Sequence, residues 1–190
     1  MVQKVARVVS HVLSPTVLGT LVLLSIPLRY AAVAWAPTLV AAAFTIVIPW
    51  AVLVWMRMTA RVTDLHVTRR EQRWPILLIA LVSILAGLGL LRLMGASPIV
   101  FAEMGLFLAG LLITGAANLF WKLSIHAAVA SFAALHCLAP LPLGPQLAVV
   151  LIALVGWSRI RITHHTASQV LAGTVVGAAV SLGGLLPPLG

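Results

Sequence analysis

The stretch PIVFAEMGLFLAGLLITGAANLF, residues 98 to 120, decides the fold class, because Glu103 is its only charged residue. An apolar run of about 20 residues is the length that a helix needs to cross a bilayer. Lipid permits only helices and closed barrels, since no other structure satisfies its own backbone hydrogen bonds. The run is far longer than the roughly 10-residue alternating strands of a barrel, so it predicts a spanning helix.

Six further apolar segments flank this stretch, and proline, glycine or charged residues separate them. They lie at about residues 11 to 28, 38 to 57, 75 to 94, 124 to 139, 146 to 160 and 167 to 187. Hydrophobic residues make up 62% of the 190 residues and charged residues 8%, which lies outside the range of soluble domains. The sequence therefore predicts an all-α, polytopic transmembrane helical bundle with six to seven spanning helices, formed by residues 1–190 as a single domain.

The net charge is +9, and the basic residues gather at the ends of the apolar segments. Basic residues meet lipid headgroups and anionic substrates there, so we expect a membrane partner and no nucleic acid. Seven crossings put the N-terminus, residues 58–74, Lys122 and residues 159–165 on one membrane face, called side A. Most lysines and arginines lie on side A, which predicts that this face is cytoplasmic in an integral protein of a prokaryotic inner membrane.

Three segments on side A hold most of the residues that can do chemistry. They read TDLHVTRREQRWP at 63–75, WKLSIHAA at 121–128 and WSRIRITHHTASQVLAG at 157–173. Ionisable groups beside spanning helices indicate function, because burying them in hydrocarbon brings no structural benefit unless they pair. Acids are scarce, since Asp64, Glu71 and Glu103 are the only ones in the chain. The clusters therefore predict a pocket for an anion, and we expect a phosphate carried by a lipid.

The segment at residues 157–173 resembles the PAP2 (type 2 phosphatidic acid phosphatase) superfamily of membrane phosphatases. The family's third motif is SR, five residues, H, three residues and D. It matches Ser158, Arg159, the residues IRITH, His165 and the residues TAS, with Gln169 in place of the aspartate. The second motif, PSGH, reads here as LSIH at 123–126, so serine and histidine are kept while proline and glycine are not.

The family's first motif, K, six residues and RP, has the weakest counterpart. Arg73 falls at the arginine, His66 replaces the lysine, and Trp74 displaces the proline to Pro75. Two apolar segments separate this motif from the second one here, whereas the usual six-helix arrangement has a loop there. The resemblance covers about residues 63 to 177.

The resemblance implies a role for each matched residue. His165 would attack phosphorus to form a phosphohistidine, and His126 would protonate the leaving oxygen as general acid. The phosphate would be held by Arg159, Arg73, Ser124, Ser158 and Lys122, with His66 as a further candidate. Gln169 would orient His165 in place of the family's aspartate. The chemistry requires no metal and no cofactor, and the chain is short of the carboxylates that a magnesium site uses.

Other interpretations of these residues stay open. A catalytically silent relative could serve as a lipid-binding or structural subunit of a membrane complex, because the motifs are degenerate. A haem-binding electron carrier would need two histidines facing each other, which His126 and His136 on one segment cannot provide. We expect His136 and His164 to be structural. Gly173 and Gly177, spaced as GxxxG, predict a close helix crossing, and a helix-mediated oligomer stays open.

Overall fold

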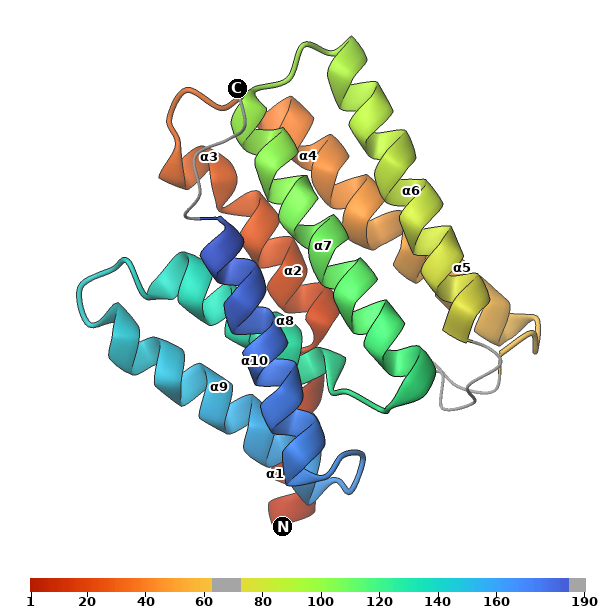
Figure 1. Cartoon of the computed structure of the whole chain (residues 1–190), viewed down its shortest axis with the longest axis vertical. Helices are drawn as coiled ribbons and strands as arrows, with labels where there is room; N and C mark the ends of the chain where they lie inside the picture. Colours follow the sequence, from red (N-terminus) through yellow and green to blue (C-terminus); the bar gives the residue numbers. More distant parts are fainter. Residues whose placement is uncertain (63–72, 185–190) are drawn as a thin grey trace. The chain divides into compact units, whose positions relative to one another are not determined.

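The computed structural model describes residues 1–62 and 73–184, and over these ranges the chain is helical without a strand (Figure 1). The helices are α1 Val2–Val12, α2 Pro15–Leu24, α3 Ile26–Arg29, α4 Trp35–Ala42, α5 Ile48–Met58, α6 Arg73–Leu93, α7 Pro98–Phe120, α8 Ile125–Ala133, α9 Gly144–Arg161 and α10 Ala167–Gly183. A π-helical turn, Ala43–Val47, joins α4 to α5, and a second one, Ala134–Leu138, extends α8. The all-α prediction is confirmed.

Four helical stretches are long and apolar enough to cross a membrane: Val2–Arg29, Trp35–Met58, Trp74–Leu93 and Pro98–Phe120. Two shorter apolar helices, Ile125–Leu138 and Ala167–Gly183, fall below that length. Large apolar side chains on the outside of the helices are exposed, as lipid-facing positions are. The protein is therefore an α-helical integral membrane protein, and the count of six to seven crossings stays a prediction.

The chain divides into two compact units. Unit 1 consists of Met1–Val22 and Leu112–Gly190, and unit 2 consists of Leu23–Leu111. The chain passes from one unit to the other within α2 and again within α7. The expectation of a single domain stays a prediction.

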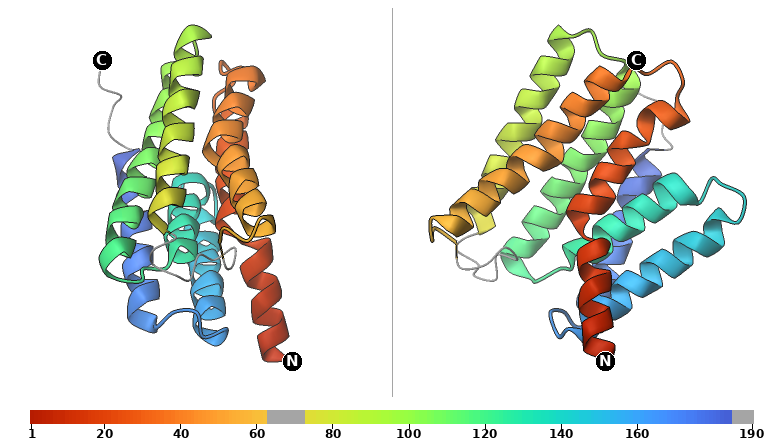
Figure 2. Two further views of the ribbon diagram at one scale, coloured as in Figure 1. Left: turned by 90° about the vertical axis from the view of Figure 1, so that its right-hand side faces the viewer. Right: turned by 180° about the vertical axis from the view of Figure 1, so that it is seen from behind.

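Unit 2 packs α4, its π-helical turn and α5 against α6 (Figure 2). Its core contains the fully buried side chains of Leu23, Ile26, Leu91, Val100 and Met104. The close approach of α6 to the π-helical turn depends on Gly87, where a Cβ would lie 2.6 Å from Phe44 Cβ. Such close contacts stabilise the association of helices in a membrane. Lipid tails are as apolar as the side chains, so tight packing takes the place of the hydrophobic effect between helices.

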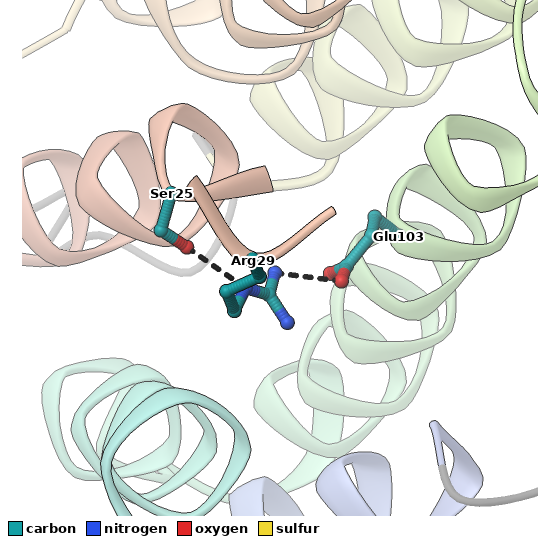
Figure 3. A network of polar contacts seen from close by, with 3 residues as sticks. All are labelled: Ser25, Arg29 and Glu103. Atoms are coloured by element: carbon teal, nitrogen blue, oxygen red, sulfur yellow. Dashed lines mark hydrogen bonds and ion pairs between the residues drawn. The ribbon is translucent and has the colours of Figure 1, made fainter. Parts of the chain in front are cut away.

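Unit 2 also contains an ion pair that joins α3 to α7 (Figure 3). Arg29 Nη2 donates to Glu103 Oε1 at 2.7 Å, and Arg29 Nε donates to Ser25 Oγ at 3.1 Å. Glu103 is 4% exposed, and its pairing explains how a carboxylate is tolerated in the apolar stretch of residues 98 to 120.

Unit 1 is built around the crossing of α8 and α10, with α9 packed beside them and α1 packed against α9 (Figures 1 and 2). The two glycines of α10 lie at this crossing. A Cβ on Gly173 would meet the Ser124 carbonyl oxygen, and one on Gly177 would meet that of Ala128. The close helix crossing expected from GxxxG is confirmed, and it sets the start of α8 against the start of α10.

Candidate functional site

Polar side chains of unit 1 gather where α9 ends, α10 begins and α8 begins. We call this set the basic cluster and define it as Lys122, Ser124, Arg159, His164, His165 and Gln169, joined by Ser10 of α1. It unites two of the three sequence segments singled out above. Of the remaining segment, residues 63–75, the described part is 73–75, which begins α6 in unit 2.

The turn between α9 and α10 holds two histidines in place. Thr163, with φ of 57°, turns the chain through the left-handed region, and Thr166 then caps α10. Thr166 Oγ1 accepts from Gln169 N at 3.4 Å, and Gln169 Oε1 accepts from Thr166 N at 3.2 Å. This capping box matches the T-x-x-Q pattern of residues 166–169, which explains locally why a glutamine suits position 169.

The same amide oxygen of Gln169 favours one tautomer of His165. Gln169 Oε1 lies 3.2 Å from His165 Nδ1, and its bond from Thr166 N identifies it as the oxygen end of the amide. An amide oxygen only accepts, so Nδ1 of His165 carries the proton and donates it. The lone pair of the neutral ring is consequently on Nε2, the nitrogen that can act as a nucleophile.

The surroundings of His165 favour its neutral form. Burial, followed by the positive charges of Arg159 and Lys122, lowers the pKa of His165 from 6.5 to about 4. Gln169 and the Lys122 backbone oppose this shift without cancelling it, because both can accept a hydrogen bond from the protonated ring. A neutral imidazole beside two cations has the protonation state that a nucleophile at an anion site requires.

Arg159 is the most deeply buried charged residue of the basic cluster, at 2% exposure. Its Nη1 donates to Ser10 Oγ at 2.6 Å, and its Nη2 lies 3.1 Å from His164 Nδ1. Because a guanidinium can only donate, Nδ1 of His164 is the acceptor, and His164 is therefore neutral in this arrangement. Nε of Arg159 is buried and has no partner in the described part of the chain.

Arg159 has no carboxylate partner among the described residues. Within residues 1–62 and 73–184 the single acid is Glu103, and it pairs with Arg29 in unit 2. Moving a charged group out of water costs roughly several kcal/mol of solvation free energy, unless a counter-charge or strong hydrogen bonds offset that cost. A hydroxyl and an imidazole offset it only in part, so the cluster has an excess of positive charge suited to an anion.

The start of α8 adds donors to the cluster. Ser124 is fully buried, caps α8 by accepting from Ala127 N at 3.4 Å, and donates its own N–H to the Gln169 carbonyl oxygen at 3.2 Å. Lys122 is exposed two residues earlier, and His126 lies half-buried in the first turn of α8. Convergence of His126 and His165 on one phosphate stays a prediction.

The other residues expected from the sequence lie elsewhere. Ser158 is buried, and its hydroxyl donates to Val155 O at 2.7 Å within α9. Arg73 is the first residue of α6 in unit 2, with its side chain outside the described part of the chain, and His66 also lies outside the described residues.

Two members of the cluster were missed as site residues. His164 was expected to be structural, and its bond to Arg159 depends on the turn between α9 and α10. Ser10 precedes Arg159 by 149 positions, and only the packing of α1 on α9 brings them together. The sole sequence signal for Ser10 is a small polar residue four positions after Ala6, on the buried side of α1.

Comparisons with known proteins add no relative: the chain matches no protein-family model, no curated protein and no solved structure.

Proposed function

We propose that the protein is a membrane lipid phosphatase of the type 2 phosphatidic acid phosphatase class, with six to seven spanning helices. Its substrate is a phosphate or diphosphate monoester of a lipid, such as phosphatidic acid, phosphatidylglycerol phosphate or a polyprenyl diphosphate. One observation carries the proposal. Arg159, Lys122 and the neutral His165 lie close together without a carboxylate partner among the described residues, which supports an anion site.

The reaction proceeds in two displacements at phosphorus. Nε2 of His165 attacks the terminal phosphorus, the bond from this phosphorus to the ester oxygen of a monophosphate or to the bridging oxygen of a diphosphate breaks, and His126 gives a proton to that oxygen. Water then attacks the phosphohistidine, His126 takes a proton from it, and inorganic phosphate leaves. The proton on Nδ1, directed at Gln169 Oε1, supports attack through Nε2.

Arg159 contributes donors to the phosphoryl oxygens, and Lys122 contributes charge. Two of the five N–H bonds of Arg159 are engaged by Ser10 and His164, which leaves others for an oxyanion. Ser124, Ser158, Arg73 and His66 are the further phosphate-binding candidates. The fixed orientation of Arg159 supports stabilisation of the charge that develops in the transition state.

The lipid tail stays in the bilayer while the headgroup enters from side A, the cytoplasmic face of a prokaryotic inner membrane. The position of the basic cluster at helix ends supports a lipid substrate over a soluble one, because a headgroup reaches helix ends while its tail stays in the bilayer. No metal, cofactor or nucleic acid takes part in this proposal.

The test is release of inorganic phosphate from a panel of lipid phosphates by the purified protein. We expect release by the wild type, its loss in His165→Ala and in His126→Ala, and unchanged release in His11→Ala, where an exposed histidine of α1 is removed. Rapid quenching with a radiolabelled substrate should trap phosphohistidine in the wild type and in His11→Ala, and not in His165→Ala. A wild type that releases no phosphate from any lipid, and traps no phosphohistidine, would refute the proposal.

One observation favours a second candidate, a catalytically silent lipid-binding or structural subunit of a membrane complex. Arg159 is 2% exposed with both Nη atoms already bonded, and Gln169 brings no charge to His165. Such a subunit would bind phosphate-bearing lipid without turnover. Lipid binding by the wild type that His165→Ala leaves intact, together with absence of phosphate release, would identify it.

A further inference from the structure

The bond between α1 and the end of α9 goes beyond the motifs of residues 63–177. Ser10 is 5% exposed and Arg159 is 2% exposed, so their 2.6 Å contact is sheltered from water. Charge-assisted hydrogen bonds in such surroundings are stronger and more directional than exposed ones. Ser10 is therefore placed to determine how the guanidinium is oriented.

One face of α1 is buried against the rest of unit 1. Ala6 and Ser10, one helical turn apart, are its two buried residues, while Lys4 and Arg7 are exposed. The small side chain of Ala6 allows α1 to approach α9 closely, and in the described part of the chain Ser10 supplies the only side-chain hydrogen bond between α1 and α9. Arg159 has no carboxylate to hold it among the described residues, so its orientation depends on Ser10 from one side and His164 from the other.

We propose that Ser10 is a positioning residue for phosphate capture: by holding Nη1 of Arg159 it presents the remaining N–H donors of the guanidinium to the phosphoryl oxygens. The proposal rests on the phosphatase function and adds α1 to the site. Ser10 itself does not touch the substrate. Its loss affects how well Arg159 captures phosphate, and the fold of unit 1 is retained because the α8–α10 crossing does not involve Ser10.

The test compares Ser10→Ala, which removes the hydroxyl, with Ser10→Thr, which keeps it, and with Ser14→Ala. Ser14 is a matched control, because its hydroxyl only accepts from Val17 N at 3.4 Å. Phosphate release gives kcat and KM, and the shift in melting temperature with added inorganic phosphate gives binding without turnover. We expect Ser10→Ala to raise KM about tenfold, because the loss of one orienting hydrogen bond to a charged group weakens binding by about that factor. It should also abolish most of the phosphate-induced shift, while Ser10→Thr and Ser14→Ala behave like the wild type.

The two measurements separate this inference from the proposed function. Wild-type phosphate stabilisation that Ser10→Ala loses and Ser10→Thr retains supports Ser10 even if no lipid is hydrolysed, and that result refutes only the phosphatase. Unchanged KM and unchanged phosphate stabilisation in Ser10→Ala overturn the role of Ser10. A lower KM in Ser10→Ala also overturns the role of Ser10, because the hydrogen bond from α1 would then be keeping Arg159 away from the phosphate. A wild type that neither binds phosphate nor releases it overturns both proposals.

Discussion

Gln169 performs two tasks through one oxygen atom. It accepts from Thr166 N to close the capping box and faces Nδ1 of His165 at 3.2 Å. An aspartate in this position would add a negative charge that favours protonation of the imidazole, whereas the amide selects the tautomer alone. The charges of Arg159 and Lys122 therefore act on His165 without a counter-charge in the described part of the chain.

The pH dependence of activity should report this arrangement. The pKa of His165 is lowered to about 4, so the folded protein keeps the ring neutral as the pH falls from 6.5 toward 4. The unfolded chain binds a proton over that window, so the contribution of His165 makes the protein less stable as the pH falls. We expect the acid limb of kcat/KM to lie well below pH 6.5.

Substitutions at position 169 should shift the pH dependence of activity and change the turnover rate. Gln169→Glu keeps the shape of the side chain and adds a charge, which raises the pKa of His165, moves the acid limb to higher pH and increases turnover. Gln169→Asp should also increase turnover, and Gln169→Leu should reduce kcat at least about tenfold; loss of the equivalent carboxylate in serine proteases costs about 10⁴. Thr166→Ala, which removes the cap alone, is the control. An acid limb that stays in place in Gln169→Glu would contradict the pairing of Gln169 with His165.

At the scale of elements, the site depends on how closely α8 and α10 cross. Gly177 faces the Ala128 carbonyl and Phe132 N, and Gly173 faces the Ser124 carbonyl. Backbone cannot move aside as a flexible side chain can, so even one methyl group must separate the helices. Separation would also break the bond from Ser124 N to Gln169 O, and the residues that bracket the site would move with it.

Gly177→Ala should therefore lower both stability and activity. Overpacking costs about 1–3 kcal/mol, and we expect the upper part of that range because the clash is with backbone. Gly89→Ala in α6 is the matched control: a Cβ there meets nothing within 4 Å, so better helix propensity should leave the protein unchanged or slightly more stable. Melting temperature in detergent measures both. Equal melting temperatures for the two variants would show that the crossing tolerates a methyl group.

At the scale of the whole molecule, the prediction concerns the two faces of the membrane. Five apolar segments separate position 68 from position 188, so an odd number of crossings puts the two positions on opposite faces. In a Cys137→Ala background, Thr68→Cys should resist an impermeant thiol reagent applied to intact cells, and Pro188→Cys should react. Labelling at 68 alone would invert the orientation. Labelling at both or at neither would mean an even number of crossings between them, as when one of the shorter helices does not span.

The sequence by itself determined the helical class, the membrane environment and most helix limits, because apolar runs and the breaks between them are local properties of the chain. The stretch 98 to 120 became α7 with the same limits, and GxxxG at 173–177 became a close crossing. The N-terminal limit of the predicted segment 11 to 28 was set too late. The helical stretch begins at Val2, since residues 2–12 form an amphipathic helix with too few apolar residues in a row to stand out.

The surroundings of the site were decided only by the tertiary structure. Motif spacing pointed to Arg159, His165, Ser124 and Gln169, but it carried no sign that Arg159 would be 2% exposed and held by Ser10. Ser10 and Arg159 are 149 positions apart, and no local pattern records which residue of a distant helix will meet a buried cation. The lowered pKa of His165 has the same origin, because burial and the charges of Arg159 and Lys122 act through space and exist only once α8, α9 and α10 are packed together.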